Sequence, residues 1–283
     1  MKRKILFPDK NKNKNKECRK PKKSLGQHFL RDQKIQDRIT NDFKGVAKAI
    51  IEVGPGQGAL TKGLAALAVT YLVVEKDLSL IEYLKKYVTD EQIIIADALE
   101  IDWNKFIEEK NLQSVWLVSN LPYNISAPLF VKFLKSSHIK YMTLMFQLEV
   151  GEKILGSGEM NRLHGLSSPY LDIKVLNHVS KNSFWPKPKV ESIVLSMVRR
   201  EEGCEQSQMP LLPLKEIDSY ENFLRELFKY KRKQILTVLK SFNSSVDLVA
   251  LLNELQLDHR MRAEDLDLKQ VISLYKGYKN LCQ

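Results

Sequence analysis

A regular alternation of short apolar runs with helix-like segments, between Lys48 and Arg199, constrains the fold of this chain more than any other feature. The apolar runs that fit buried strands occupy residues 48–53, 71–75, 92–96, 114–119 and 140–146. Helical spacing separates them at residues 59–68, 78–88 and 126–136. This order predicts an α/β domain in which a mostly parallel sheet is covered by helices on both faces.

Two further strand-like runs, at residues 169–180 and 190–199, leave no room for a long helix between them. We expect them to form an antiparallel addition at the edge, which completes a seven-stranded sheet. After Arg200 the sequence changes character, because residues 203–218 contain Gly203, Pro210 and Pro213 and are typical of a linker. Helical spacing resumes at 219–241, 245–256 and 263–277. The predicted organisation is an α/β domain over 23–202, a linker over 203–218 and a small all-helical domain over 219–283.

Positive charge is concentrated near the start of the chain. The net charge is +11, and residues 1–23 hold 11 Lys or Arg against Asp9 and Glu17, a net of +9. The run NKNKNK has no apolar periodicity and cannot bury a core, so residues 1–22 are predicted to be a basic disordered tail. Such a tail is either a solubilising segment or an arm that binds phosphates.

A second basic cluster lies in a stretch with helical spacing near the C-terminus. It consists of Lys229, Lys231, Arg232 and Lys233, interrupted by Tyr230. The alternative to RNA binding is a solvated helix face, which is the usual meaning of a charge run. We predict that these cations contact RNA phosphates and that residues 219–283 are an RNA-binding domain.

Other features exclude several classes of protein. No apolar stretch approaches 18 residues, and Ile5-Leu6-Phe7 is shorter than the apolar core of a signal peptide, so a cytoplasmic protein without a membrane partner is expected. Cys18, Cys204 and Cys282 lie far apart without CxxC or Cys/His spacing. Neither a disulfide framework nor a metal site is predicted.

The first predicted strand runs into EVGPGQGALT at 52–61, and a helix follows. Glycines at Gly54 and Gly56 let the backbone pass close to a nucleotide-like ligand that faces the N–H groups of the helix. Glu75 ends the next strand, 21 residues after Gly54, where an acid commonly bonds a ribose. Together these features predict a nucleotide-type cofactor.

The identity of that cofactor is open on this loop alone. Gly54, Gly56 and Ala59 also satisfy the relaxed dinucleotide pattern, so NAD is an alternative. The additional Gly58, and Glu52 placed to receive hydrogen bonds around a cationic ligand, favour a different cofactor. Asp97, just past the third strand, fits either a contact with an adenine amino group or a helix N-cap.

Asn120-Leu121-Pro122-Tyr123 closes the fourth predicted strand. A tight turn would account for Asn and Pro. With the glycine loop, however, the sequence resembles class I S-adenosylmethionine methyltransferases that act on amino groups. More narrowly, it resembles the KsgA family of ribosomal RNA adenine N6-dimethyltransferases. The blocks that carry this resemblance are KSLGQHFL at 23–30, EVGPGQGALT at 52–61, NLPYNIS at 120–126, FWPKPKVESIVL at 184–195 and RMRAEDLDL at 260–268.

The resemblance implies a Rossmann-like class I methyltransferase fold and S-adenosylmethionine as cofactor, without a metal. Cofactor contacts are implied at His28, Leu30, Gly54, Gly56, Glu75, Asp97 and Asn120. His28 stands where relatives often have Asn, and it can still donate one hydrogen bond. The implied activity is dimethylation of two adjacent adenosines in the 3′-terminal hairpin loop of small-subunit (16S) rRNA, by a monomer acting on an immature 30S particle.

In this interpretation Asn120 and the Leu121 carbonyl accept the two amine hydrogens, so that the nitrogen lone pair becomes available. Pro122 restricts the conformation of Leu121, and Tyr123 stacks on the flipped base. The resemblance places Phe184 on the other face of the base, although a core aromatic is its alternative. Two other functions stay open: a large-subunit (23S) rRNA methyltransferase of the macrolide-resistance type, and an assembly factor whose RNA binding matters more than its catalysis.

Overall fold

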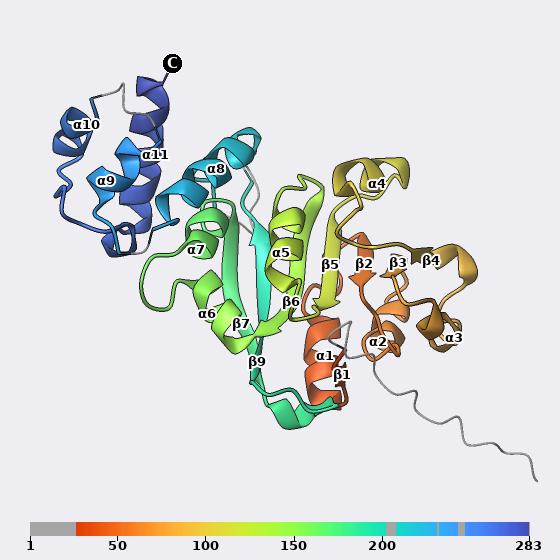
Figure 1. Cartoon of the computed structure of the whole chain (residues 1–283). Helices are drawn as coiled ribbons and strands as arrows, with labels where there is room; N and C mark the ends of the chain where they lie inside the picture. Colours follow the sequence, from red (N-terminus) through yellow and green to blue (C-terminus); the bar gives the residue numbers. More distant parts are fainter. Residues whose placement is uncertain (1–26, 202–207, 231, 243–246, 283) are drawn as a thin grey trace, which may run out of the picture.

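A seven-stranded sheet forms the centre of the computed structural model, which describes residues 27–201, 208–230, 232–242 and 247–282 (Figure 1). The strand order is β4-β3-β2-β5-β6-β9-β7. The strands are β2 (Ala49–Val53), β3 (Thr70–Glu75), β4 (Ile93–Ile95), β5 (Val115–Asn120), β6 (Ile139–Gln147), β7 (Leu171–Val179) and β9 (Ser192–Arg199). Each coincides with a predicted strand within a few residues.

The sheet is parallel from β4 to β6 and antiparallel beyond it. β9 pairs antiparallel with both β6 and β7. The predicted antiparallel addition of two strands is therefore confirmed, with one refinement. The strand of reversed direction is β9, which lies one place inside the edge, while the edge strand β7 runs in the same direction as the parallel strands.

Two apolar layers cover the sheet, because successive strand residues point to opposite faces. On β2, Ile50 faces one layer and Ile51 the other, and neither is more than 1% exposed. The layer on the side of Ile50 contains α1 (Gln33–Asn41), α2 (Thr61–Ala65) and α3 (Ile81–Leu84). The layer on the side of Ile51 contains α4 (Trp103–Glu109), α5 (Ser126–Leu134), α6 (Leu148–Leu155) and α7 (Arg162–Ser167). This is the doubly covered sheet that the apolar runs predict.

The C-terminal helices gather beyond one end of the sheet (Figure 1). They are α8 (Ile217–Leu227), α9 (Ile235–Lys240), α10 (Leu248–Glu254) and α11 (Leu268–Leu281). Their apolar faces join the same buried cluster as α4–α7. Lys135, just after α5, forms ion pairs with Asp218 and Glu221 of α8 at 2.7 and 2.6 Å. The predicted division at residues 203–218 stays an interpretation, and α8 already begins at Ile217, inside the predicted linker.

The stretch 219–241, which has continuous helical spacing, corresponds to two helices with a break between Leu227 and Ile235. The break has a tertiary cause, because Ile235 N–H donates to the Met261 carbonyl at 2.7 Å and Gln234 forms a β-bridge with Arg262. Lys229, Arg232 and Lys233 therefore lie in the connection between α8 and α9, and their predicted placement in a helical stretch is wrong.

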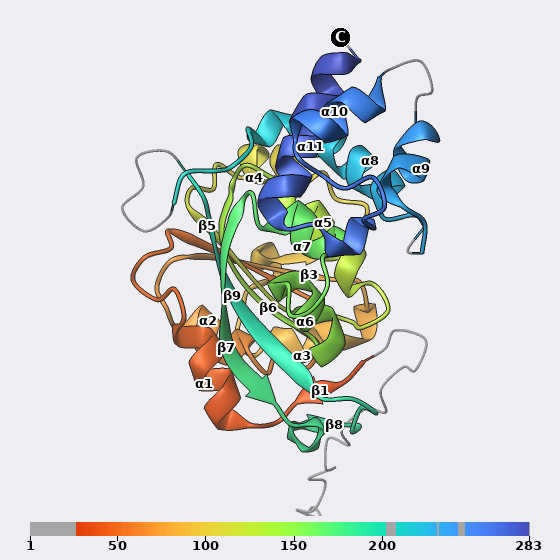
Figure 2. The ribbon, with the colours of Figure 1, turned by 90° about the vertical axis from the view of Figure 1, so that its left-hand side faces the viewer.

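A separate two-stranded ladder joins β1 (Phe29–Leu30) to β8 (Phe184–Trp185). Figure 2 shows this pair at the end of the molecule opposite the C-terminal helices. Two-residue strands carry no readable periodicity, so the sequence does not predict the ladder. Its consequence is that the segment before α1 is held beside the carboxyl ends of the central strands.

Candidate functional site

A cavity of about 300 Å³ opens at the carboxyl ends of β2, β3 and β5. From β2 the chain first adds β3 and β4 on one side and then β5 and β6 on the other. Open α/β sheets bind ligands at such a switch point in the strand order. The cavity brings together nearly all the residues that the sequence predicts for cofactor and amine. These are His28, Leu30, Gly54, Gly56, Glu75, Asp97, Asn120, Leu121, Pro122 and Tyr123.

The glycine loop after β2 forms one wall of the cavity. Gly54 has φ +66° and donates its N–H to the Val74 carbonyl at 2.9 Å. Gly56 has φ +60°, and a Cβ there would lie 3.1 Å from the Phe29 ring. A left-handed backbone at both positions, together with the close ring at the second, explains why glycine is required here.

Glu75 organises this loop in addition to facing the cavity. Its carboxylate accepts the N–H of Gly56 at 3.1 Å and the N–H of Asp77 at 2.8 Å. Burial raises the pKa of the Glu75 carboxyl. Each carboxylate oxygen has a further acceptor site, so Glu75 can hold the loop and bind a ligand hydroxyl together. The sequence predicts only the second role.

Asp97 lies at the next strand end and has two partners. Its Oδ1 accepts the Leu99 N–H at 3.0 Å, and its other oxygen forms an ion pair with Lys76. The Lys76 hydrogen bond lowers the pKa of the Asp97 carboxyl. Asp97 therefore lines the cavity and caps a local turn, not a helix, and its contact with an adenine amino group stays a prediction. The sequence motifs do not identify Lys76 as a cavity residue, although its position directly after Glu75 could have indicated it.

Glu52 lies beneath the glycine loop and is only 1% exposed. Its carboxylate accepts hydrogen bonds from the hydroxyls of Thr61, at 2.7 Å, and Tyr71. Burial raises the pKa of Glu52 to about 7, against the effect of both hydroxyls. A buried anion that already has two donors is suited to face a cationic ligand, and Tyr71 is a partner that the sequence does not reveal.

This pKa makes stability depend on pH in a defined direction. Between pH 4.5 and about 7 the folded state holds a proton on Glu52 that the unfolded chain releases, so the free energy of unfolding falls as pH rises. The full effect is about 3 kcal/mol. We expect Glu52→Gln to make this decrease smaller, as measured by urea unfolding at pH 5 and pH 8, while the part due to Glu75, whose pKa is also raised by burial, remains. Glu254→Gln, an exposed change of the same kind, should keep the full decrease. Equal slopes in wild type and Glu52→Gln would contradict the assignment.

Asn120 is the last residue of β5, and its orientation is fixed. Its Nδ2 donates to the His28 main-chain carbonyl at 3.0 Å. Because a carbonyl oxygen only accepts, the amide nitrogen must face it, and Oδ1 is turned the other way. Within the described ranges, no donor bonds the carbonyl of Leu121, which follows Asn120. Two consecutive residues that line the cavity therefore each keep an acceptor oxygen to which no described donor is bonded.

Tyr123 is held at both ends of its side chain. Its hydroxyl lies 2.7 Å from the Ser192 Oγ, and its ring stacks on the His28 ring with centroids 5.4 Å apart. Phe184 is not brought into the cavity: it is 4% exposed and packs in the apolar layer that contains Leu30. Its predicted contact with a base stays a prediction.

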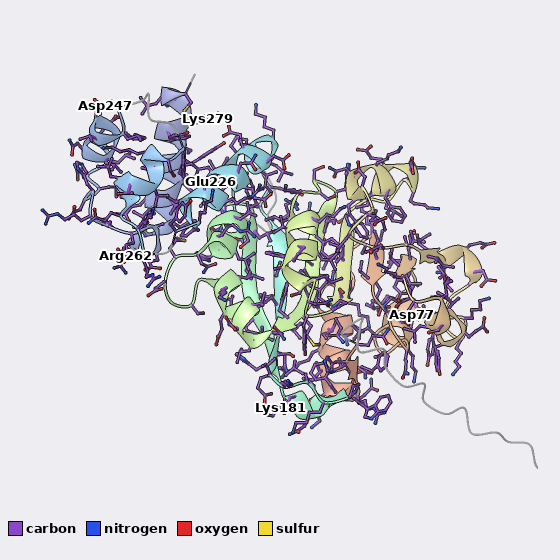
Figure 3. All side chains as sticks on the ribbon, in the orientation of Figure 1. Asp77, Lys181, Glu226, Asp247, Arg262 and Lys279 are labelled. Carbon is purple, nitrogen blue, oxygen red and sulfur yellow. The ribbon has the colours of Figure 1, made fainter. Side chains whose placement is uncertain are left out.

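The basic cluster lies apart from the cavity. Lys229 forms an ion pair with Glu226 at 3.1 Å, and Lys233 Nζ lies 4.7 Å from the centre of the Tyr230 ring. Arg232 lies in the same connection, and Lys231 is outside the described residues. Figure 3 shows Glu226 among the C-terminal helices, remote from Asp77 and Lys181. The structure does not join the cluster to the cofactor residues.

Two kinds of feature are absent from the described residues. None of the helices there is long and apolar enough to cross a membrane. No group of three or more His, Cys, Asp or Glu in those ranges is arranged to hold a metal ion.

Comparison with known proteins gives a consistent result. The sequence pattern of the family described as "Ribosomal RNA adenine dimethylase" matches residues 18–280. The "Ribosomal RNA small subunit methyltransferase A" of Mycoplasmopsis synoviae is 34% identical over 259 residues, covering 90% of this chain and 95% of the relative. The protein of the same name from Clostridium botulinum is 35% identical over 260 residues, covering 88% and 90%.

Solved structures share the fold. A dimethyladenosine transferase from Plasmodium falciparum superposes with a TM-score of 0.71 at 23% identity, covering 90% of this chain and 98% of that one. The 23S rRNA methyltransferase ErmE gives a TM-score of 0.63 at 25% identity, covering 90% and 100%. The predicted methyltransferase fold is therefore confirmed, C-terminal helices included.

Proposed function

Because the chain belongs to the ribosomal RNA adenine dimethylase family, we propose that it dimethylates N6 of two adjacent adenosines in the 3′-terminal hairpin loop of small-subunit (16S) rRNA. The substrate we propose is an immature 30S particle in the cytoplasm, and the enzyme acts as a monomer. The observation that carries this proposal is the fixed orientation of Asn120, whose Nδ2 is engaged by the His28 carbonyl.

The adenine amine is a poor nucleophile, because its lone pair is delocalised into the ring. Asn120 Oδ1 and the Leu121 carbonyl accept one amine hydrogen each, which favours a pyramidal nitrogen. Tyr123, steadied by Ser192, supplies an aromatic face for the flipped base. These acceptors act most strongly when the nitrogen pyramidalises, so they lower the barrier rather than only bind the substrate.

The residues at the glycine loop fit S-adenosylmethionine. A Cβ on Gly54 would meet no atom within 4 Å, so the loop leaves open space at the cavity. In this proposal Glu75 binds the ribose and Asp97 the adenine amine, and His28, Leu30 and Gly56 complete the wall. When bound, the cofactor supplies a methyl group activated by a sulfonium. Glu52 provides negative charge below the loop for this cation.

The test uses immature small and large ribosomal subunits, incubated separately with the protein and labelled S-adenosylmethionine. We expect label at two adjacent adenosines near the 3′ end of small-subunit rRNA. Label confined to large-subunit RNA would instead support a 23S rRNA methyltransferase activity, the one for which ErmE is named. Binding without label would support the assembly-factor alternative.

We further propose that the cluster around Tyr230 contacts rRNA phosphates. Replacing Lys231, Arg232 and Lys233 with Gln should weaken subunit binding and reduce the log–log salt slope by about 0.7–0.9 for each phosphate that is no longer neutralised. Cofactor affinity should not change, because the cluster is not part of the cavity. The measurement is a salt titration of subunit binding.

The matched control removes the same number of charges elsewhere, at the exposed Lys86, Lys105 and Lys110. This control should keep the wild-type slope. If the cluster variant also keeps it, the cluster serves solubility, and the search for the RNA contact moves to residues 1–22.

A further inference from the structure

Asp97 is held at both carboxylate oxygens by partners on different elements. Its Oδ1 accepts the Leu99 N–H at 3.0 Å, within the loop that follows β4. Its Oδ2 pairs with the ammonium of Lys76, the first residue after β3. Because β3 and β4 are adjacent parallel strands, this ion pair joins the ends of two neighbouring strands, and both of its residues line the cavity. Rotation of the carboxylate is therefore restricted from both sides.

The backbone of the loop that follows β4 has its own support. Trp103 Nε1 donates to the Ala98 carbonyl at 3.2 Å, and Lys132 of α5 donates its Nζ to the Leu99 carbonyl. Neither contact involves Lys76, so the loop does not depend on that lysine for its shape. Removal of the Lys76 ammonium should therefore release one side chain, the carboxylate that it pairs with, and leave the backbone of the loop in place.

The Lys76–Asp97 pair lies at the open side of the cavity. The Lys76 side chain is 61% exposed and the Asp97 side chain 21%. The shared hydrogen bond raises the pKa of the Lys76 ammonium and lowers the pKa of the Asp97 carboxyl, so both groups are charged at neutral pH. An exposed ion pair contributes little to the stability of a fold. Its position at the cavity therefore points to a role in binding a ligand.

An ionised carboxylate can distinguish two purines by the group at ring position 6. It has about four lone-pair sites and no donor, and Leu99 and Lys76 occupy one site each. The amino group of adenine donates and can bond a remaining site, whereas the 6-oxygen of hypoxanthine would place two acceptors against each other. This discrimination requires a fixed carboxylate, because one that rotates away from the ring neither bonds the amine well nor repels the oxygen.

We propose that Lys76 is a positioning residue that makes the cofactor site selective for adenine, because it fixes the orientation of the Asp97 carboxylate. This inference rests on the proposed function, which assigns Asp97 to the adenine amine of S-adenosylmethionine. Lys132 also contributes positive charge near Asp97, but its Nζ bonds a backbone carbonyl and leaves the carboxylate to Lys76. Loss of the Lys76 charge should therefore change which base the site accepts.

The test measures binding without RNA and without reaction. Calorimetry gives the dissociation constants of S-adenosylhomocysteine and of its 6-deaminated analogue, S-inosylhomocysteine, and their ratio defines the base preference. We expect the wild type to prefer adenine by about tenfold or more, the scale of a hydrogen bond to a charged group. Asp97→Asn should bring the ratio close to one, because an amide can turn either its oxygen or its NH₂ group toward the ring.

Lys76→Met keeps an unbranched side chain and removes its charge. It should reduce the base preference about three- to fivefold, the scale of an exposed ion pair, whereas Lys76→Arg should retain most of the preference. Higher salt should lower the preference of the wild type but not that of Lys76→Met. In a protein that already carries Asp97→Asn, Lys76→Met should have no further effect, since the group that it positions is absent.

The matched control is Lys85→Met, which removes an exposed cation paired with Asp90 at 3.1 Å, away from the cavity. It should keep the wild-type preference.

Two results for Lys76→Met would overturn the inference and leave the proposed function standing. An equal loss of affinity for both compounds would show that Lys76 supports the cavity in general. A higher preference for adenine would show that the ammonium bonds the 6-oxygen instead of positioning Asp97. If the wild type binds neither compound, the proposed function itself fails, and the inference fails with it.

Discussion

Replacing Asn120 with Ala is expected to slow methyl transfer by about a hundredfold or more, the scale seen when one preorganised group at a transition state is removed. In the proposed function Asn120 Oδ1 accepts an amine hydrogen, the His28 carbonyl fixes the amide through Nδ2, and the contribution of Oδ1 is largest when the amine pyramidalises. The measurement is the single-turnover rate on immature small subunits. Cofactor binding should stay measurable by calorimetry.

The matched control is Asn41→Ala, where the exposed amide bonds the Asp37 carbonyl on α1. Its rate should equal that of the wild type. A near-normal rate for Asn120→Ala would show that the amine is activated by other groups. Loss of cofactor binding together with rate would show that Asn120 acts mainly in holding the cofactor.

Glu75→Ala should raise the dissociation constant for S-adenosylmethionine about ten- to a hundredfold. This corresponds to about 1.5–3 kcal/mol, the value of one hydrogen bond to a charged group. The structure adds a second reason, because the substitution also removes the acceptor of the Gly56 N–H and releases the glycine loop. Calorimetry with cofactor alone tests this without RNA.

Glu82→Ala provides the comparison, since Glu82 is exposed on α3 and pairs with Lys85 at the surface. It should leave the affinity unchanged. Glu75→Gln helps to distinguish the two roles: if affinity falls as far as in the Ala variant, the negative charge is required. An unchanged affinity in Glu75→Ala would mean that the cofactor lies elsewhere.

The sequence predicts most of the fold because the inner parallel strands β2, β3, β5 and β6 are mostly buried on both faces. Such strands appear as continuous apolar runs, and the run at 48–53 corresponds to β2, in which no residue from Ala49 to Val53 is more than 3% exposed. The positions of the glycine loop and of the Asn120–Tyr123 segment can be predicted from the same strands. Each comes directly after such a strand, so parallel topology alone places both at one edge.

Sequence-based prediction fails for a physical reason where pairing is short or nonlocal. The β1–β8 ladder pairs Phe29 with Trp185, which lies far along the chain, and neither strand is long enough to show a period. The break between α8 and α9 depends on a hydrogen bond from Ile235 to Met261. The helical spacing of one segment carries no information about a hydrogen-bond partner in a later segment.

Amino-acid sequence by itself determined which groups stand at the strand ends: the glycines, Glu75, Asp97 and Asn120. Only the tertiary structure decided which hydrogen bonds and ion pairs those groups form within the protein. Glu75 bonds Gly56, Lys76 pairs with Asp97, and the His28 carbonyl orients Asn120. Strand periodicity records which residues are buried, because burial depends on a side chain's own chemistry. Hydrogen-bond direction depends on where a second segment lies, and only the folded chain fixes that position.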